Sequence, residues 1–341
     1  RATLGDTHPD TLRSINNLGE LLQGHDLRNA APLLVEALEG RRATLGNTHP
    51  ATLRSINNLG LLRKAQGDLA GAATLYDEAL AGRRATLGDA HPDTLGSISN
   101  LGMLLEAQGD LAGAEPLLRE AQAVYRETLG DMHPDTLTSI NNLGGLLHAQ
   151  GDLAGAAQLF REALAGRRAT LGDTHPDTLR SINNLGELLQ GHDLRNAAPL
   201  LVEALEGRRA TLGNTHPATL RSINNLGLLR KAQGDLAGAA TLYDEALAGR
   251  RATLGDAHPD TLGSISNLGM LLEAQGDLAG AEPLLREAQA VYRETLGDMH
   301  PDTLTSINNL GGLLHAQGDL AGAAQLFREA LAGRRATLGD T

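Results

Sequence analysis

The chain has 341 residues, a formal net charge of −12 and no cysteine. The missing cysteine excludes disulfides, thiol catalysis and cysteine-ligated metals. The acidic balance argues against nucleic acid and anionic membranes as partners. No apolar run approaches the length of about 18 residues that a membrane-spanning helix needs.

The sequence repeats itself at two lengths. Residues 168–341 are identical to residues 1–174, and within each copy a Gly-Asp/Asn-x-His-Pro segment recurs every 41 or 42 residues. A period of 20–50 residues is typical of arrays in which each unit packs only on its neighbours. We therefore expect one continuous array of eight units after the tail of a preceding unit. The tail is 1–7, and the units are 8–48, 49–90, 91–132, 133–174, 175–215, 216–257, 258–299 and 300–341.

The first half of each unit predicts a helix, as residues 49–90 illustrate. His49-Pro50 marks its start, because proline suits the first helical position and pushes the preceding residue out of the α region. Leu53, Ile56, Leu59 and Leu62 follow at intervals of three, which places them in one apolar stripe.

The second half of the unit predicts another helix. Gly67 supplies the turn, Asp68 the N-cap and Gly88 the C-terminal stop. Arg83 and Arg84 fall in the last turn, where cations are favoured by the helix dipole. No strand pattern competes with this pair of helices. The apolar stripe of the second helix consists of Leu69, Ala72, Ala73, Tyr76, Ala79, Leu80 and Leu87.

A glycine recurs inside the first helix of every unit, as at Gly60. It costs on the order of 1 kcal/mol relative to alanine. We interpret it as a point of close approach between the two helices, opposite a small residue such as Ala72. Each unit is then a tight helical hairpin.

These residues resemble the tetratricopeptide repeat. Leu59-Gly60, Gly67, Ala72, Tyr76 and Ala79 match its spaced Leu-Gly, Gly, Ala, aromatic and Ala positions. The 42-residue length and the His-Pro-Asp-Thr-Leu…Asn-Asn-Leu-Gly start are similar to the kinesin-light-chain type of that family. The resemblance implies an all-α fold, an α-solenoid in which stacked antiparallel helix pairs form a right-handed superhelix.

Two features depart from the family pattern. Arg63 and Arg230 replace the usual apolar or aromatic residue late in the first helix. The first and fifth units lack one residue near 23–25, which predicts a shorter helix or a tighter turn.

The resemblance implies that the first helices line a concave groove that holds a protein or peptide. One asparagine per unit is then expected to point into that groove, where its amide can both donate and accept hydrogen bonds. The alternative is that these asparagines stabilise neighbouring first helices. The set is Asn17, Asn58, Asn100, Asn142, Asn184, Asn225, Asn267 and Asn309.

Basic residues flank this asparagine ladder. They attract an acidic peptide in one interpretation and are ordinary solvated helix charges in the other. Gly96 and Thr138 stand at the equivalent positions of the third and fourth units, so that a basic zone alternates with a neutral one. The basic candidates are Arg13, Arg54, Lys64 and their copies Arg180, Arg221 and Lys231.

The sequence contains no pattern typical of an enzyme. Phosphate loops, nucleophile elbows and dinucleotide fingerprints are missing. Eight of the twelve histidines are helix starts, which a stack strings out instead of bringing together. We expect no catalytic residue, no metal and no cofactor.

Two functions stay open. The first is a non-enzymatic scaffold that binds a protein or peptide ligand. The second is a structural filament in which uncapped ends stack head to tail, since arrays normally need terminal repeats with a polar outer face and none is recognisable. The compartment is open, although the kinesin-light-chain resemblance implies the cytoplasm.

Overall fold

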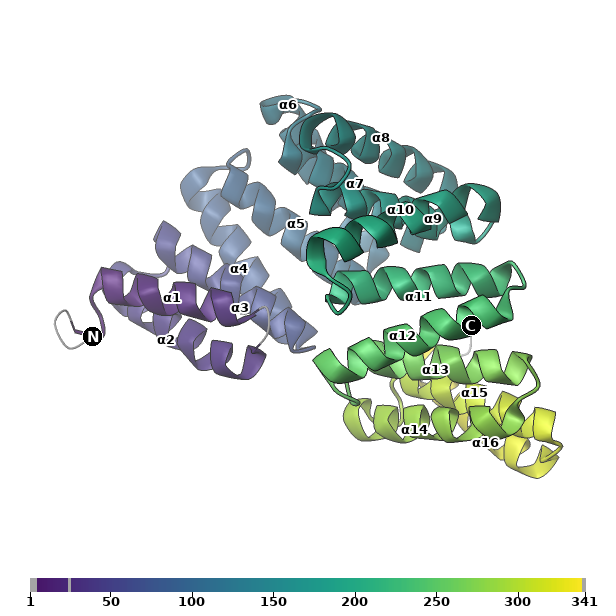
Figure 1. Ribbon diagram of the computed structural model, residues 1–341. Helices are drawn as coiled ribbons and strands as arrows, with labels where there is room; N and C mark the ends of the chain where they lie inside the picture. The colour runs from purple at the N-terminus through teal and green to yellow at the C-terminus, as the bar shows by residue number, and fades with distance from the viewer. Residues whose placement is uncertain (1–4, 24–25, 339–341) are drawn as a thin grey trace. The chain divides into compact units, whose positions relative to one another are not determined.

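The computed structural model describes residues 5–23 and 26–338, and these contain sixteen α-helices and no strand (Figure 1). The chain forms two compact units, Arg1–Thr170 and Leu171–Thr341. None of the described helices has an apolar stretch that would cross a bilayer. The helices are α1 (Pro9–Gln23), α2 (Leu27–Leu45), α3 (Pro50–Ala65), α4 (Leu69–Leu87), α5 (Pro92–Ala107), α6 (Leu111–Leu129), α7 (Pro134–Ala149), α8 (Leu153–Leu171), α9 (Pro176–Gln190), α10 (Leu194–Leu212), α11 (Pro217–Ala232), α12 (Leu236–Leu254), α13 (Pro259–Ala274), α14 (Leu278–Leu296), α15 (Pro301–Gln317) and α16 (Leu320–Leu338).

Stacked antiparallel pairs make up the array. Each odd-numbered helix, called here a first helix, packs against the even-numbered second helix that follows it. Within each of the two compact units, a second helix also packs on the first helix of the following repeat, as α4 does on α5. Successive first helices touch each other directly, for example α1 with α3 and α13 with α15. The predicted helical array is therefore confirmed.

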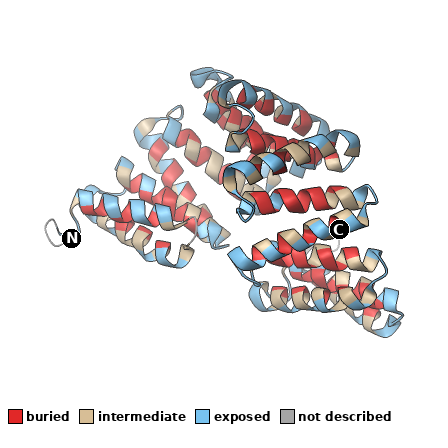
Figure 2. Ribbon diagram, in the orientation of Figure 1, coloured by how far each residue is buried: buried red, intermediate tan, exposed pale blue. Residues whose placement is uncertain are grey.

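Within each compact unit the cores lie between the helix layers and join one helix pair to the next. Tyr76 and Leu80 of α4 pack on Leu95 and Ile98 of α5. First helices are buried on several sides, and α11 is coloured as buried through most of its length in Figure 2. Burial of these aliphatic side chains supplies the main driving force for stacking the pairs.

First helices begin at the His-Pro segments, as predicted. His49 has an extended backbone, with φ −66° and ψ 138°, and α3 starts at Pro50. The histidine has a further role that the sequence did not suggest. Its Nδ1 accepts a hydrogen bond of 3.1 Å from the amide of Ala51, so the side chain itself caps the helix.

The turn and cap residues of the second helices also follow the prediction. Gly67 takes a left-handed conformation with φ +81°, and Asp68 Oδ1 accepts a hydrogen bond of 2.9 Å from the Gly71 amide. Gly88 ends α4 with φ +83° and donates its amide to Arg84 O at 3.1 Å.

The shorter repeats lose residues from the first helix. Helices α1 and α9 have 15 residues where α3 has 16. In the fifth repeat Gly191 stands at the turn with φ −72°, so the left-handed glycine of the other repeats has no counterpart there. The equivalent Gly24 and His25 lie outside the described residues.

The glycine inside the first helix has a different neighbour from the one expected. A Cβ on Gly60 would lie 2.6 Å from Cε1 of Tyr76, whereas Ala72 was predicted to be opposite. The close approach is real, but a flat aromatic ring fills the gap that the missing side chain leaves. Any side chain at this position must displace the ring.

The two arginines at the end of each second helix have separate roles, and the dipole interpretation is wrong for the first of them. Arg83 is buried, and its Nη1 donates to Ser97 Oγ and Asp93 O, both at 2.8 Å. Arg84 is half-exposed and pairs with Glu120 of the next second helix at 2.7 Å. Such exposed pairs contribute little stability individually, although this one recurs along the stack.

Candidate functional site

The predicted asparagines lie where successive first helices meet, and several of them donate across that junction. Asn58 donates to Glu20, which also accepts from Asn16 at 2.6 Å. Asn58 and Asn225 are buried. Asn17 is exposed, and Asn142 and Asn184 are half-buried. The other printed pairs are Asn100 to Asn57 at 3.0 Å, Asn225 to Glu187 at 3.2 Å, Asn267 to Asn224 at 3.0 Å and Asn309 to Met270 Sδ at 3.5 Å.

These hydrogen bonds join neighbouring repeats. Amides that are paired in this way fix the distance between first helices. A ligand that reached the amides of Asn58, Asn100, Asn225, Asn267 or Asn309 would compete with these protein partners. Asn267 and Asn309 combine this role with a place in the wall of a cavity.

The basic candidates do not form one group. Arg13 pairs with Asp10 at 3.0 Å, and Arg54 is exposed. Lys64 is half-buried, and its Nζ donates to Met103 O at 3.4 Å, away from the two arginines. Burial lowers the pKa of Lys64, and the nearby Glu106 opposes that shift. The copies repeat the arrangement, with Arg180 on Asp177 at 2.9 Å, Arg221 exposed and Lys231 half-buried.

Arg13 and Arg54 instead converge on a third arginine that the sequence interpretation missed. A cavity of about 350 Å³ opens between α1 and α3, with its back wall at the end of α2. We call the three guanidinium side chains the arginine cluster: Arg13, Arg41 and Arg54. The remaining wall is formed by Pro9, Asp10, Leu12, Leu45, His49 and Ala51.

Arg41 is the buried member of the cluster, with 3% of its surface exposed. Its Nη1 donates to Ser55 Oγ at 2.7 Å and to Ala51 O at 3.0 Å. Burial lowers the pKa of Arg41, the charge of Arg54 lowers it further, and Glu20 acts in the opposite direction. The guanidinium is therefore held in place by neutral partners in a cationic surrounding.

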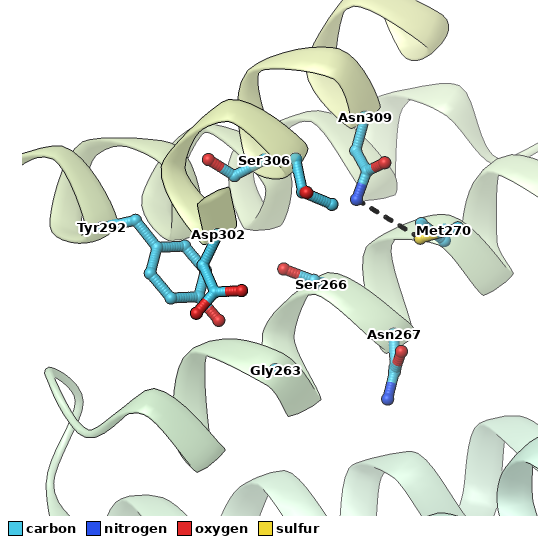
Figure 3. Close-up of a pocket in the computed structure, with 9 residues that line it drawn as sticks. Gly263, Ser266, Asn267, Met270, Tyr292, Asp302, Ser306 and Asn309 are labelled. Carbon is cyan, nitrogen blue, oxygen red and sulfur yellow. Dashed lines mark hydrogen bonds between the residues drawn. The ribbon is translucent and has the colours of Figure 1, made fainter. Parts of the chain in front are cut away.

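A second cavity, of about 250 Å³, lies between α13 and α15 (Figure 3). Its polar groups are hydroxyls, amides and one carboxylate. Figure 3 shows Asn309 directed at Met270, while Asn267 extends the other way and donates to Asn224 of α11. Its wall consists of Gly263, Ser266, Asn267, Met270, Tyr292, Asp302, Thr305, Ser306 and Asn309.

Tyr292 closes the back of this second cavity and is buried. Burial, followed by the charges of Asp302 and Asp260, raises its pKa to about 12, so the phenol stays neutral at physiological pH. A Cβ added to Gly263 would meet nothing within 4 Å. The cavity therefore owes part of its space to the missing side chain of that glycine.

The two cavities occupy the same place in their repeats. Gly263 and Thr305 stand where Arg13 and Arg54 stand in the first two repeats, and Tyr292 stands where Arg41 does. We call the second site the tyrosine cavity. One architectural position thus carries three guanidinium groups in one case, and in the other a polar lining with one carboxylate, Asp302, and no cation.

The described residues contain no group of three or more histidine, aspartate or glutamate side chains that could hold a metal ion. His49 lines the first cavity, but its Nδ1 is occupied by the Ala51 amide. What both cavities offer is hydrogen bonding and charge, which is the chemistry of recognition.

Comparison with known proteins agrees with this geometry. Tetratricopeptide repeat models match residues 11–51, 52–93, 178–218 and 219–260, and a second model of the same repeat matches 93–169 and 260–336. The comparison with curated proteins finds no match.

Several solved structures are similar. A kinesin-light-chain-like protein of Podosopora anserina with nearly identical TPR-like repeats is 28% identical, with a TM-score of 0.50 over 60% of this chain and 98% of that chain. BtubC (BKLC) of P. vanneervenii is 26% identical, with a TM-score of 0.55 over 69% and 94%. The Rap conjugation gene regulator of plasmid pLS20 shares the fold at 13% identity, with a TM-score of 0.65 over 96% and 95%.

The family models together cover most of the chain, and they match the helix pairs that the structure shows. The chain belongs to the tetratricopeptide repeat family, with repeats of the kinesin-light-chain type.

Proposed function

We propose that the array is a non-enzymatic scaffold that binds a peptide segment of another protein along its first helices. The observation that carries this proposal is the pair of equivalent cavities between successive first helices, each lined by polar side chains. Their linings differ between repeats, while the first helices that frame them all begin at His-Pro segments. Variation confined to one surface is the pattern expected of a recognition site on a repeated framework.

The asparagine ladder complements these cavities. Its amides line the junctions that a bound chain would follow, and one of them, Asn100, is half-buried. Amide groups suit an extended peptide because they match both its N–H and C=O groups. The Rap regulator of plasmid pLS20 was solved with the Phr* peptide, so a fold of this kind accommodates a peptide.

A random dodecapeptide display library, panned on the immobilised chain, tests the proposal. The blocking variant is Ser99→Tyr with Ser266→Tyr, because both serines are half-buried and Ser266 lines the tyrosine cavity. We expect peptides enriched on the original chain to bind the blocking variant at least about tenfold more weakly, a difference of about 1.4 kcal/mol.

The matched control carries the same change on the outer face. Thr74 and Thr241 are exposed on the second helices α4 and α12. The variant Thr74→Tyr with Thr241→Tyr should bind the enriched peptides as the original chain does. Failure to enrich any peptide, or equal binding by the blocking variant, contradicts the proposal.

A second candidate function is assembly of the chain with copies of itself. Helix α16 exposes Leu320, Phe327 and Leu331, and helix α1 exposes Leu18 and Leu21. The equivalent of Phe327 in α4 is Tyr76, which is fully buried beneath the next first helix. We infer that these two apolar faces stack on each other, which propagates head to tail into a filament.

Light scattering over a concentration series tests this second candidate. The mass of the particles should rise with concentration for the original chain and stay at that of one chain for Leu320→Glu with Leu331→Glu. Because Leu320 and Leu331 are at least half exposed, the substitutions should leave the helix content measured by circular dichroism unchanged. A constant mass for the original chain excludes self-assembly and leaves the peptide-binding proposal untouched.

A further inference from the structure

We propose that the arginine cluster binds a doubly charged oxyanion, namely a phosphate group, and that its copy in residues 171–341 forms a second such site. The copy consists of Arg180, Arg208 and Arg221. This inference does not depend on the peptide-binding proposal, because it requires only the cavity and its charges.

The buried arginine supplies the fixed part of the site. Arg41 is almost fully buried, yet the hydrogen bonds described for it go to the neutral Ser55 Oγ and Ala51 O. Ser55 Oγ in turn donates to Asn16 Oδ1 at 3.0 Å, which locks the arrangement. The carboxylate that influences Arg41, Glu20, accepts hydrogen bonds from asparagine amides and not from the guanidinium.

The neighbouring Arg42 shows how a guanidinium group in this chain is paired with a carboxylate. Arg42 lies one residue further along α2, and its Nη2 donates to both carboxylate oxygens of Glu78, at 2.6 and 2.7 Å. Guanidinium groups favour such charge-assisted contacts with carboxylate or phosphate oxygens. Arg41 and Arg54 make no such contact among the hydrogen bonds described, so their donors suit an anion that enters the cavity.

The charge balance selects a dianion. The cluster carries three positive charges, and Asp10, paired with Arg13 at 3.0 Å, contributes one negative charge. Counted over the residues that line the cavity, and so without Glu20, the remaining charge of +2 matches a phosphate monoester, which carries about −1.5 to −2 at neutral pH. A single carboxylate would leave one cation unmatched.

The second cluster shows the same arrangement with a further observation. Arg208 is 2% exposed, and its Nη1 donates to Ser222 Oγ at 2.7 Å, to Ala218 O at 3.0 Å and to Asn183 Oδ1 at 3.2 Å. Burial and the charges of Arg221 and Arg180 lower the pKa of Arg208 to about 10, although Glu187 opposes the shift. Nε of Arg180 is buried and has no hydrogen-bond partner among the described atoms. An incoming oxyanion would satisfy that donor.

The repeats also explain why two such sites are expected. In the next repeat the buried Arg83 has Gly96 in place of a second flanking arginine; burial lowers the pKa of Arg83, and the charge of Asp93 opposes that shift. In the third repeat Tyr125 replaces the buried arginine altogether. Only the junction between the first two repeats of each 167-residue copy combines all three guanidinium groups.

Isothermal titration calorimetry with inorganic phosphate at pH 7.5, with chloride balancing the ionic strength, tests the proposal. We expect two sites per chain and a similar affinity for sulfate. Acetate, with one charge, should bind at least about tenfold more weakly. Phosphate affinity should fall as the pH drops from 7.5 to 5.5, because inorganic phosphate loses its second charge near pH 7, and a phosphate monoester near pH 6, while sulfate keeps both charges.

The variant Arg54→Gln with Arg221→Gln removes one exposed guanidinium from each cluster and should weaken phosphate binding at least about tenfold. The matched control, Arg161→Gln with Arg328→Gln, removes two exposed arginines outside the clusters and should leave binding unchanged. Circular dichroism checks that each variant is folded. Arg13→Gln with Arg180→Gln is a second variant that should repeat the loss.

Two further probes distinguish the origin of the phosphate. Tighter binding of N-acetylphosphoserine amide than of inorganic phosphate assigns the site to a phosphorylated side chain of a partner. Tighter binding of adenosine monophosphate assigns it to a free small molecule. Absence of phosphate binding, or full binding by a folded Arg54→Gln, Arg221→Gln variant, overturns the proposal.

Discussion

The cavity between α1 and α3 and the cavity between α13 and α15 are two versions of one site. In the first, Arg13 and Arg54 face a buried Arg41. In the second, Gly263 and Thr305 take the places of the exposed arginines, and a buried tyrosine takes the place of Arg41. The helices that frame the two cavities begin at the same His-Pro segments.

The comparison shows which positions of the repeat vary and which do not. His-Pro starts, aspartate N-caps and left-handed glycines set the backbone, and they are nearly constant from repeat to repeat. Four positions per junction decide the charge of the cavity, namely those of Arg13, Arg41 and Arg54 and that of Ala51, where the tyrosine cavity has Asp302. The array therefore changes what it can recognise without changing how it folds.

The largest expected effect is a change in stability when either of two glycines in the first helices, Gly60 or Gly96, is replaced by alanine. A Cβ on Gly60 would lie 2.6 Å from the Tyr76 ring, whereas a Cβ on Gly96 would meet nothing within 4 Å. Gly60→Ala with Gly227→Ala should destabilise the chain by about 1–3 kcal/mol per site through overpacking. Gly96→Ala with Gly263→Ala should stabilise it by about 1 kcal/mol per site through helix propensity.

Urea unfolding followed by circular dichroism measures both double variants. The two pairs carry the same chemical change at buried or half-buried helical positions, so they serve as controls for each other. Equal shifts in the same direction would mean that the tyrosine cavity is not open space created by a glycine.

A smaller effect, one additional phosphate site, is expected when the tyrosine cavity is converted into an arginine cluster. The variant Gly263→Arg, Tyr292→Arg, Thr305→Arg, Asp302→Ala places three arginines where the cluster has them and an alanine where the first cavity has Ala51, while Asp260 stands where Asp10 does. The number of phosphate sites measured by calorimetry should rise from two to three. If it stays at two, guanidinium placement at these positions does not make the site.

The smallest effect concerns the tyrosines. Burial is the largest cause that raises the pKa of all four to about 12, and carboxylates contribute only at Tyr125 and Tyr292. Because the folded chain keeps the phenol proton that the unfolded chain releases, the tyrosine contribution to stability should be lost as the pH rises from about 10 to about 12 and should be constant below that window.

Absorbance at 295 nm measures ionisation of the tyrosines. In a Tyr76→Phe, Tyr243→Phe variant it reports only Tyr125 and Tyr292, the two tyrosines on which carboxylates act. Adding Asp135→Asn and Asp302→Asn should lower the pKa of Tyr125 and Tyr292 by a fraction of a unit and leave it above the ordinary value. An unchanged titration would show that the aspartates do not act on the tyrosine cavity.

The features that were predictable from the sequence are those set by neighbours along the chain. His49-Pro50 starts a helix, and Gly67, Asp68 and Gly88 form a turn, a cap and a stop, because each depends on local backbone preference. The spacing of apolar residues then predicts which helix faces are buried.

The arginine cluster was not predictable in the same way, because its buried member is defined by tertiary packing. Gly40-Arg41-Arg42 reads as two cations at a helix end, and nothing local distinguishes the buried arginine from the exposed one. One signal was available: the third repeat has Tyr125 at the position of Arg41 and keeps an arginine at the next. A large aromatic at that position indicates burial.

A crystal structure of the chain soaked in selenate tests the central claim most directly, because selenium scatters anomalously and locates each bound dianion. We predict one selenate at Arg13, Arg41 and Arg54, a second at Arg180, Arg208 and Arg221, and none in the tyrosine cavities. Selenate bound elsewhere on the first helices, or equally in both kinds of cavity, would contradict the account.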